Sequence, residues 1–214
     1  MFKAIIFDYN GVLVNDLRIH EEAYYRAGKD LGIPLARETL RKYQSYSHAQ
    51  KRKLLCGSIS DARWKEISAV KDKIYFDLAE KTNLLFPAVE TVLMALSVRY
   101  MLALASNTRR EYFKRIFPRN LATLFREKIF SDDIRYPKPS PDPLLKTMER
   151  LGMGRDECCY VGDSVLDVQM AKRAGIKVFS VATGDNSQQE LRAAGADWVV
   201  DNLSELKAKL EAGA

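Results

Sequence analysis

The sequence predicts an α/β fold: a parallel-sheet, Rossmann-like three-layer core with a small inserted α-helical cap domain. Three observations support this prediction. Short apolar runs rich in β-branched residues alternate with amphipathic stretches, as in parallel sheets covered by helices on both faces. A long helical segment interrupts this alternation after the first run. The 214 residues are also many for one domain and few for two complete ones.

Six strands are expected in the core. They are Lys3–Asp8, Met101–Ala105, Lys128–Ser131, Cys158–Gly162, Lys177–Val181 and Asp197–Val200. Residues 9–100 separate the first two strands, far more than one crossover helix needs. We therefore assign residues 14–86 to the cap, and residues 1–13 and 87–214 to the catalytic core.

The predicted cap is helical. Residues 21–33, 37–46 and 61–82 each place apolar or aromatic side chains at i, i+3 and i+4, the pattern of amphipathic helices. Trp64, Tyr75 and Phe76 fall on this pattern and are interpreted as core of the bundle. Residues 39–60 contain five basic and no acidic residues, which fits either a rim that attracts phosphorylated substrates or a solvated helix face.

Composition excludes several protein classes. The chain is 47% hydrophobic and 29% charged, as in ordinary globular proteins, and no run approaches the ~18 apolar residues of a membrane span. We expect a cytoplasmic protein with no membrane and no nucleic-acid partner, since the net charge of +6 is a mild excess. The cysteines at 56, 158 and 159 lack CxxC spacing, which indicates buried thiols.

Polar residues follow four of the expected strands. Asp8, Ser106, Lys138 and Asp163 come after the first, second, third and fourth strand in turn. Because the carboxyl ends of parallel strands meet at one crevice, we expect these side chains to converge. Asp167 lies four residues after Asp163, and a helix beginning there would place both carboxylates on the same side.

A nucleophilic carboxylate, a hydroxyl, a lysine and paired acidic residues are together typical of phosphoryl transfer through an aspartyl-phosphate. Carboxylates are ligands for Mg²⁺, the expected cofactor. Ser106, which we place at a helix N-terminus, and Lys138 are expected to bind phosphoryl oxygens.

Four stretches, FDYNGVLV, LALASNT, YPKPSPDP and VGDSVLD, resemble in order and spacing the four motifs of the haloacid dehalogenase superfamily. The resemblance is to its phosphatase and phosphomutase branch, in which a helical cap follows the first motif. It implies that Asp8 is the phosphorylated nucleophile and that Ser106 and Lys138 hold the phosphate. It implies a metal site made by Asp8, Asp163, the Asn10 carbonyl and Asp167, with Asp167 either a direct ligand or a support for the water shell.

The resemblance also implies phosphate-binding backbone amides at Asn10, Gly11 and Asn107. The position of Asn10 is normally a second aspartate, which acts as the general acid and base. An amide cannot transfer protons, and this role is commonly worth ~10²–10⁴-fold in rate. Three explanations stay open: a slow or specialised enzyme, a protein that binds phosphorylated ligands, or a chain whose aspartate was replaced to trap a complex.

The function expected from these residues is a Mg²⁺-dependent phosphatase of small phosphorylated metabolites, as a monomer or homodimer and weakened by Asn10. The alternative from another class is a non-catalytic binding or regulatory protein of the same fold. A phosphomutase is less favoured because it needs an acid and base. A dehalogenase is less favoured because it needs no metal, whereas Asp163 and Asp167 indicate one.

Overall fold

The computed structural model describes residues 2–57, 59–184 and 186–213, and the chain forms two compact units. The core unit comprises Met1–Asn15 and Leu85–Ala214, and the helical unit comprises Asp16–Leu84. The sequence-based boundaries placed residues 14–15 and 85–86 in the insert, but these four residues belong to the core unit. Val14 forms isolated β-bridges to Asn10 and Leu85, and the Phe86 N–H donates to the Leu13 carbonyl at 3.1 Å.

The core unit is built on a six-stranded sheet in the order β3-β2-β1-β4-β5-β6, and every neighbouring pair is parallel. Its strands are β1 (Ala4–Phe7), β2 (Met101–Ala105), β3 (Phe125–Ile129), β4 (Cys158–Gly162), β5 (Lys177–Val181) and β6 (Trp198–Val200). This sheet confirms the predicted Rossmann-like α/β fold.

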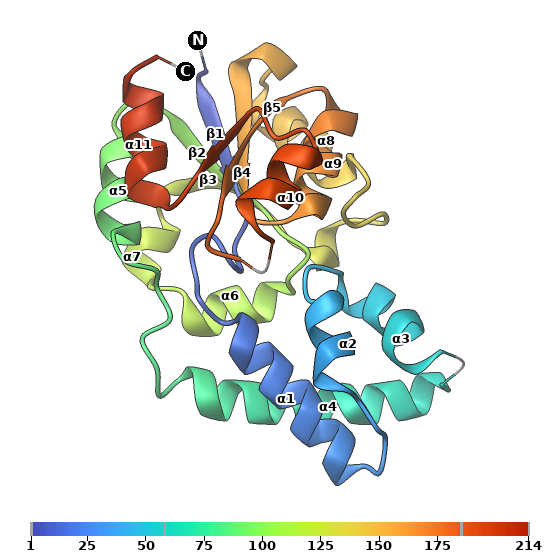
Figure 1. Ribbon diagram of the computed structural model, residues 1–214. Coiled ribbons are helices and arrows are strands. Elements are labelled where there is room, and N and C mark those ends of the chain that lie inside the picture. The colour runs from blue at the N-terminus through green and yellow to red at the C-terminus, as the bar shows by residue number, and fades with distance from the viewer. Residues whose placement is uncertain (1, 58, 185, 214) are drawn as a thin grey trace. The chain divides into compact units, whose positions relative to one another are not determined.

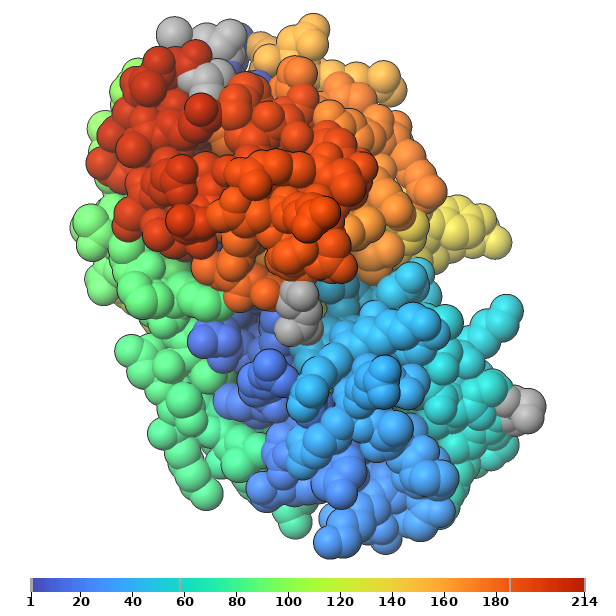
Figure 2. Space-filling view, viewed as in Figure 1, coloured from blue at the N-terminus to red at the C-terminus, as the bar shows by residue number. Residues whose placement is uncertain are grey.

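Helices cover both faces of the sheet (Figure 1). One face carries α5 (Val89–Ser97), α7 (Arg119–Ala122) and α11 (Leu203–Glu211), and the other carries α8 (Asp142–Leu151), α9 (Val165–Ala174) and α10 (Gln188–Ala193). Atoms of the C-terminal residues, in orange and red, cover much of the visible face of the core unit in Figure 2. The three layers leave the carboxyl ends of the strands as the place for a site.

Strand alternation explains the core. Ala4 and Ile6 of β1 pack with Tyr160 of β4 and with Leu144 and Val168 from the helices α8 and α9. Intervening strand residues point to the opposite face because successive side chains of a strand alternate, and the four residues of β1 are all buried. The central strands are therefore apolar on both faces. Cys158 and Cys159 are free and buried, as predicted, whereas Cys56 is free but only partly buried.

The third strand was placed incorrectly. The expected range was Lys128–Ser131, whereas β3 spans Phe125–Ile129 and the chain turns into the short helix η1 (Ser131–Asp133). The strand lies at the edge of the sheet, where alternate side chains remain partly exposed. Its charged residues Arg126 and Glu127 therefore hid the strand from an apolar pattern, although Phe125 and Ile129 are buried.

A cluster of aromatic rings packs around Phe113 of the helix α6 (Arg110–Ile116). The Phe113 ring lies 4.9 Å from Phe117, 5.3 Å from Phe130 and 5.5 Å from Tyr9, measured between centroids. Such pairs add to the stabilisation from buried area. The cluster fixes the polypeptide that follows β1 and β2, which carries the candidate site.

The helical unit contains α1 (Leu17–Asp30), α2 (Arg37–Lys42), α3 (His48–Cys56) and α4 (Asp61–Ala79). Trp64, Tyr75 and Phe76 are buried, which confirms their assignment to the bundle core. No separate helix was predicted at α3. Its signal was the pair Ser47 and Gln50, which form a reciprocal capping box at its start. No described helix of either unit combines the length and apolar character needed to cross a membrane.

Charged side chains are paired inside the helical unit. Glu21, 3% exposed, accepts hydrogen bonds from Arg18 at 3.2 Å, Arg37 at 3.2 Å and Arg41 at 2.8 Å. The pKa of Glu21 is lowered, first by the hydrogen bond from Arg41. Part of the basic segment in residues 39–60 therefore binds an internal carboxylate.

A second polar network surrounds His20. The Tyr75 hydroxyl donates to Asp16 at 2.6 Å, His20 Nε2 lies 3.3 Å from the same carboxylate, and Lys71 Nζ lies 2.9 Å from His20 Nδ1. Burial, followed by the Lys71 charge, lowers the pKa of His20 to about 4. The network therefore holds a neutral imidazole that accepts from Lys71 at Nδ1.

Replacing Phe113 tests the aromatic cluster. Phe113→Ala should lower the free energy of unfolding by about 3–5 kcal/mol, because it removes a buried ring and leaves a cavity. Urea denaturation measures this change. The control Lys114→Ala alters an exposed neighbour on the same helix and should change stability by less than about 0.5 kcal/mol; equal losses for both variants would contradict the assignment.

Acidification tests the His20 network. As pH falls from the ordinary value of 6.5 towards about 4, the unfolded chain binds a proton that native His20 does not, so stability should fall across this window. NMR titration of the chain's 2 histidines should show His20 protonating near pH 4. The variant His20→Gln should lose less stability over the same interval, and a His20 midpoint near 6.5 would contradict the proposed neutral imidazole.

Candidate active site

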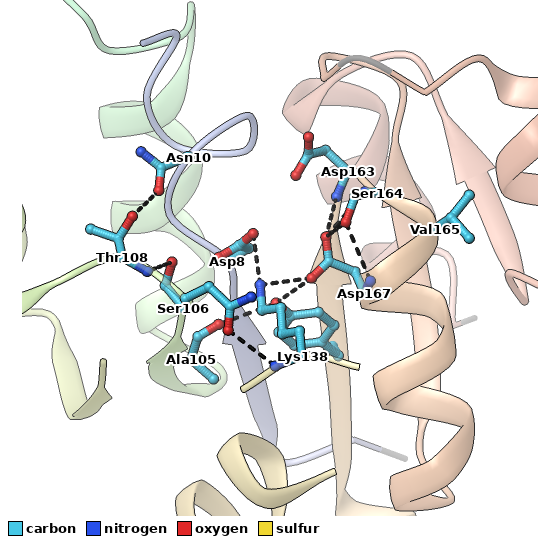
Figure 3. A network of polar contacts seen from close by, with 12 residues as sticks. Asp8, Asn10, Ala105, Ser106, Thr108, Lys138, Asp163, Ser164, Val165 and Asp167 are labelled. Atoms are coloured by element: carbon cyan, nitrogen blue, oxygen red, sulfur yellow. Dashed lines mark hydrogen bonds and ion pairs between the residues drawn. The ribbon is translucent and has the colours of Figure 1, made fainter. Parts of the chain in front are cut away.

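The predicted site residues meet at the carboxyl ends of the central strands. Asp8 follows β1, Ser106 follows β2 and Asp163 follows β4. Lys138 reaches the same place from the loop after η1, and Asp167 reaches it from the first turn of α9 (Figure 3). The positions of these five side chains agree with the sequence-based expectation of a convergent site.

Lys138 is the centre of the site. Its ammonium lies 2.8 Å from Asp8 Oδ2 and 2.7 Å from Asp167 Oδ1, and it is 2% exposed. Burial acts to lower the pKa of Lys138, but the charges of Asp167 and Asp8 outweigh burial and raise the pKa above its ordinary value. The lysine is therefore a fixed cation that holds two carboxylates, one from the end of β1 and one from the first turn of α9.

Both Asp167 oxygens are engaged by the protein. Oδ2 accepts from the Ser164 hydroxyl at 2.6 Å, from the Ser164 N–H at 3.1 Å and from the Asp163 N–H at 3.2 Å. Oδ1 accepts from the Tyr160 hydroxyl at 3.0 Å in addition to Lys138. Ser164 is the N-cap of α9, so Asp163 lies just before the helix and not on its face. Its carboxylate nevertheless lies close to that of Asp167, on the same side as expected. Asp167 instead turns back to cap its own helix.

Asp8 has one oxygen without a protein partner. Among the described residues, Asp8 Oδ1 is buried and has no hydrogen-bond partner, whereas Oδ2 is paired with Lys138. Burial raises the pKa of Asp8 to about 6, with Lys138 opposing and the Asp167 charge adding to the rise. This arrangement leaves a lone carboxylate oxygen at the end of β1.

Asp163 lies against two glycines. A Cβ at Gly11 would lie 2.2 Å from Asp163 Oδ2, and a Cβ at Gly184 would lie 1.8 Å from it, so neither position accepts a side chain without displacing the carboxylate. Gly11 also has a φ of 75°, in the left-handed region that favours glycine. Burial, followed by the Asp167 and Asp8 charges, raises the pKa of Asp163 well above its ordinary value.

The donor set fits a divalent cation. Asp8, Asp163 and Asp167 each offer an oxygen, and these three atoms lie within 4.8 Å of one another. When all three are ionised, the carboxylates outnumber the one lysine and leave two negative charges uncompensated, and Asp8 Oδ1 is without a hydrogen bond. Hard cations such as Mg²⁺ take oxygen ligands from sites of this kind.

Asn10 is bound to the loop after β2. The Thr108 hydroxyl donates to Asn10 Oδ1, and the Thr108 N–H donates to Ser106 Oγ at 3.3 Å. Asn107 Oδ1 accepts from the Lys138 N–H at 3.1 Å and so positions the lysine loop. The helix α6 begins only at Arg110, so the placement of Ser106 at a helix N-terminus was wrong.

The Gly11 backbone is already hydrogen-bonded. Its N–H donates to the Val14 carbonyl at 2.9 Å, so this predicted phosphate donor is engaged within the loop. Its carbonyl accepts from the Thr183 hydroxyl at 2.5 Å. Gly11 therefore leaves room for the Asp163 carboxylate and sets the conformation of the loop.

Sequence reasoning missed several residues that build the site: Thr108, Tyr160, Ser164, Thr183 and Gly184. Ser164 and Asp167 had a local signal, because Ser-x-x-Asp before an apolar run predicts a helix cap. The other four depend on contacts between distant parts of the chain, such as Thr183 with Gly11.

Comparison with known families decides the classification. A model of the haloacid dehalogenase-like hydrolase family matches residues 5–181, which include every predicted site residue. The chain belongs to this family.

Two known phosphatases align with the chain over different lengths. The phosphorylated carbohydrates phosphatase of Thermotoga maritima is 28% identical over 201 residues, covering 91% of this chain and 92% of that protein. The phosphoglycolate phosphatase of Escherichia coli K12 is 31% identical over 137 residues, covering 63% of this chain but 54% of that protein. The chain thus aligns with about half of the latter enzyme.

The fold is shared with solved haloacid dehalogenase-like structures. A hydrolase from Pseudomonas syringae superposes with a TM-score of 0.86 over 99% of both chains at 24% identity. At this level of identity the similarity concerns the fold. Function is therefore argued from the site itself.

Removing the central cation should destabilise the protein. Lys138→Met leaves Asp8 and Asp167 buried without a counter-charge, and breaking a buried pair in this way costs about 3–5 kcal/mol. Because the pKa of Asp8 already stands at about 6, its ionisation costs stability as pH rises, and the loss should shrink as pH falls below that value. Urea denaturation in the presence of a chelator, at pH 7 and pH 5, measures both effects.

The matched control is Lys209→Met, which alters an exposed lysine on α11 and should leave stability within about 0.5 kcal/mol of the original at both pH values. A loss for Lys138→Met of the same size at pH 5 and pH 7 would contradict a charge-based cause.

Proposed function

We propose that the chain is a Mg²⁺-dependent phosphatase of small phosphorylated metabolites that acts through an aspartyl-phosphate on Asp8, with activity limited by Asn10. The observation that carries this proposal is the buried Asp8 carboxylate, with one oxygen paired to Lys138 and the other without a hydrogen bond. The names of the relatives from Thermotoga maritima and Escherichia coli support a small phosphorylated substrate.

Asp8 and Asp163 are the proposed direct metal ligands, together with the backbone carbonyl of Asn10. Bound Mg²⁺ would supply positive charge that polarises the phosphoryl group and reduces its repulsion from the site. Asp167 is proposed as a positioning residue, because its oxygens already accept from Ser164 and Lys138. Such supporting contacts orient ligands and tune a metal site.

Lys138 has two proposed duties. It neutralises Asp8, so that an anionic phosphate can approach the carboxylate, and it offers donors to the phosphoryl oxygens. Ser106 and the backbone of Asn107, at the end of β2, are the proposed further donors. The Asn107 side chain holds the Lys138 N–H and thereby fixes the lysine loop.

The reaction divides into two displacements. An Asp8 oxygen attacks phosphorus and the leaving oxygen departs, forming the aspartyl-phosphate. Water then attacks the same phosphorus and releases Asp8 and phosphate. Each step on an alkyl ester requires a proton transfer, and Asn10 cannot perform it.

The alternative is a non-catalytic protein that binds phosphorylated ligands in the same site. The specific observation in its favour is the amide at position 10, hydrogen-bonded to Thr108. A phosphomutase needs a proton-transfer group in the same place, which disfavours it. The group of three carboxylates disfavours a dehalogenase, which needs no metal.

A phosphatase assay distinguishes these functions. Hydrolysis of p-nitrophenyl phosphate should require Mg²⁺ and should be lost in Asp8→Asn, whereas Lys209→Met should match the unaltered chain. Turnover of alkyl phosphates should rise ~10²–10⁴-fold in Asn10→Asp, because general acid and base catalysis is restored. Thermal stabilisation by phosphorylated ligands without turnover, even in Asn10→Asp, would instead support the binding protein.

A further inference from the structure

Position 10 gives the site no group that can move a proton. The Asn10 side chain is an amide, which neither gains nor loses a proton near neutral pH, and its oxygen is held by the Thr108 hydroxyl. Thr108 in turn donates its N–H to Ser106. The loops after β1 and β2 therefore hold the amide in place.

The neighbouring polar groups of the described core unit are engaged elsewhere. The Tyr160 hydroxyl lies 3.1 Å from the Ala105 carbonyl and 3.0 Å from Asp167. Lys138 bridges Asp8 and Asp167. Asp167 accepts hydrogen bonds at both oxygens. None of these three side chains offers an uncommitted atom to a water molecule attacking phosphorus, and Asp163, whose carboxylate lies close to those of Asp8 and Asp167, is a proposed metal ligand.

Neither histidine supplies the missing general base. The chain contains only His20 and His48, and both lie in the helical unit. His48 Nδ1 lies 3.0 Å from the Tyr24 hydroxyl and His48 Nε2 lies 2.8 Å from the Ser68 hydroxyl. His20 is held at Nδ1 by Lys71 and at Nε2 by Asp16. Both ring nitrogens of each histidine are therefore committed inside that unit.

We infer that Asp8 accepts its phosphoryl group from acyl phosphates and that the resulting aspartyl-phosphate persists, so that the chain acts as a stoichiometric phosphoryl acceptor. This inference rests on the proposed function, because it requires Asp8 to be the nucleophile. It adds the class of donor and the lifetime of the phosphorylated state.

The two steps differ in their need for a proton. In the first, an Asp8 oxygen forms a bond to phosphorus while the bond from phosphorus to the acyl oxygen breaks, and the acyl group leaves as a carboxylate with the electron pair. Carboxylic acids have pKa values near 4, so this leaving group needs no proton at neutral pH. An alkoxide leaving group does need one, which selects against alkyl esters.

The second step, hydrolysis of the aspartyl-phosphate by water, still requires a proton transfer. Water must lose a proton as its oxygen bonds to phosphorus and the bond from phosphorus to the Asp8 oxygen breaks. Without a positioned base this step loses the ~10²–10⁴-fold that such a group contributes. Formation therefore outpaces hydrolysis, and the aspartyl-phosphate accumulates.

Intact-protein mass spectrometry tests the inference. The full chain is incubated with Mg²⁺ and acetyl phosphate, transferred by rapid desalting to donor-free buffer, and quenched in acid at intervals. One phosphoryl group should be retained per chain, with none on Asp8→Asn. Its decay should be ~10²–10⁴-fold slower than in Asn10→Asp, where a base is restored. Circular dichroism verifies that each variant is folded.

The variant Asn10→Ala distinguishes two causes of slow decay of the aspartyl-phosphate: the absence of a base, and shielding of the phosphoryl group by the Asn10 amide. Slow decay like that of the unaltered chain supports the missing base. Decay as fast as in Asn10→Asp, in either Asn10→Ala or the unaltered chain, overturns the inference and leaves the proposed function intact. Absence of the phosphoryl group from the unaltered chain, together with no Mg²⁺-dependent hydrolysis of acetyl phosphate or p-nitrophenyl phosphate by either the unaltered chain or folded Asn10→Asp, overturns the proposed function itself.

Discussion

The paired contact of Lys138 with Asp8 and Asp167 is the interaction on which the site depends. It joins the end of β1, the loop after η1 and the start of α9 through one buried cation. An unpaired carboxylate at this depth would be expensive to ionise. The lysine therefore counters the cost of burying two carboxylates, and a third carboxyl group, Asp163, completes a set of oxygen ligands that suits a divalent cation.

The polar groups around this pair are organised for binding more than for proton transfer. Asp167 is held at both oxygens, whereas Asp8 keeps one oxygen without a hydrogen bond. Asn10 has the size of an aspartate and accepts from the Thr108 hydroxyl, but its amide cannot transfer protons. Under the proposed function, the site therefore combines a nucleophile with a weakened means of completing turnover.

The helical unit satisfies its own buried charges. Glu21 is surrounded by arginines, and Asp16 is bound by Tyr75 and His20. Buried charges of this kind are retained only when paired and hydrogen-bonded. Arg41 of the basic segment and both histidines are consequently engaged inside this unit.

The sequence by itself determined the α/β class, five of the six strands to within about two residues, and the convergence of Asp8, Ser106, Lys138 and Asp163. It could do so because parallel strands deliver the residues that follow them to one edge of the sheet. Only the tertiary structure decided the position of β3, where the exposure of an edge strand masked the apolar pattern. It also decided which oxygens are engaged: Thr108 on Asn10, Tyr160 on Asp167 and Thr183 on Gly11. The contacts of Thr108 and Thr183 join residues far apart in the chain, and all three depend on side-chain packing that no local pattern encodes.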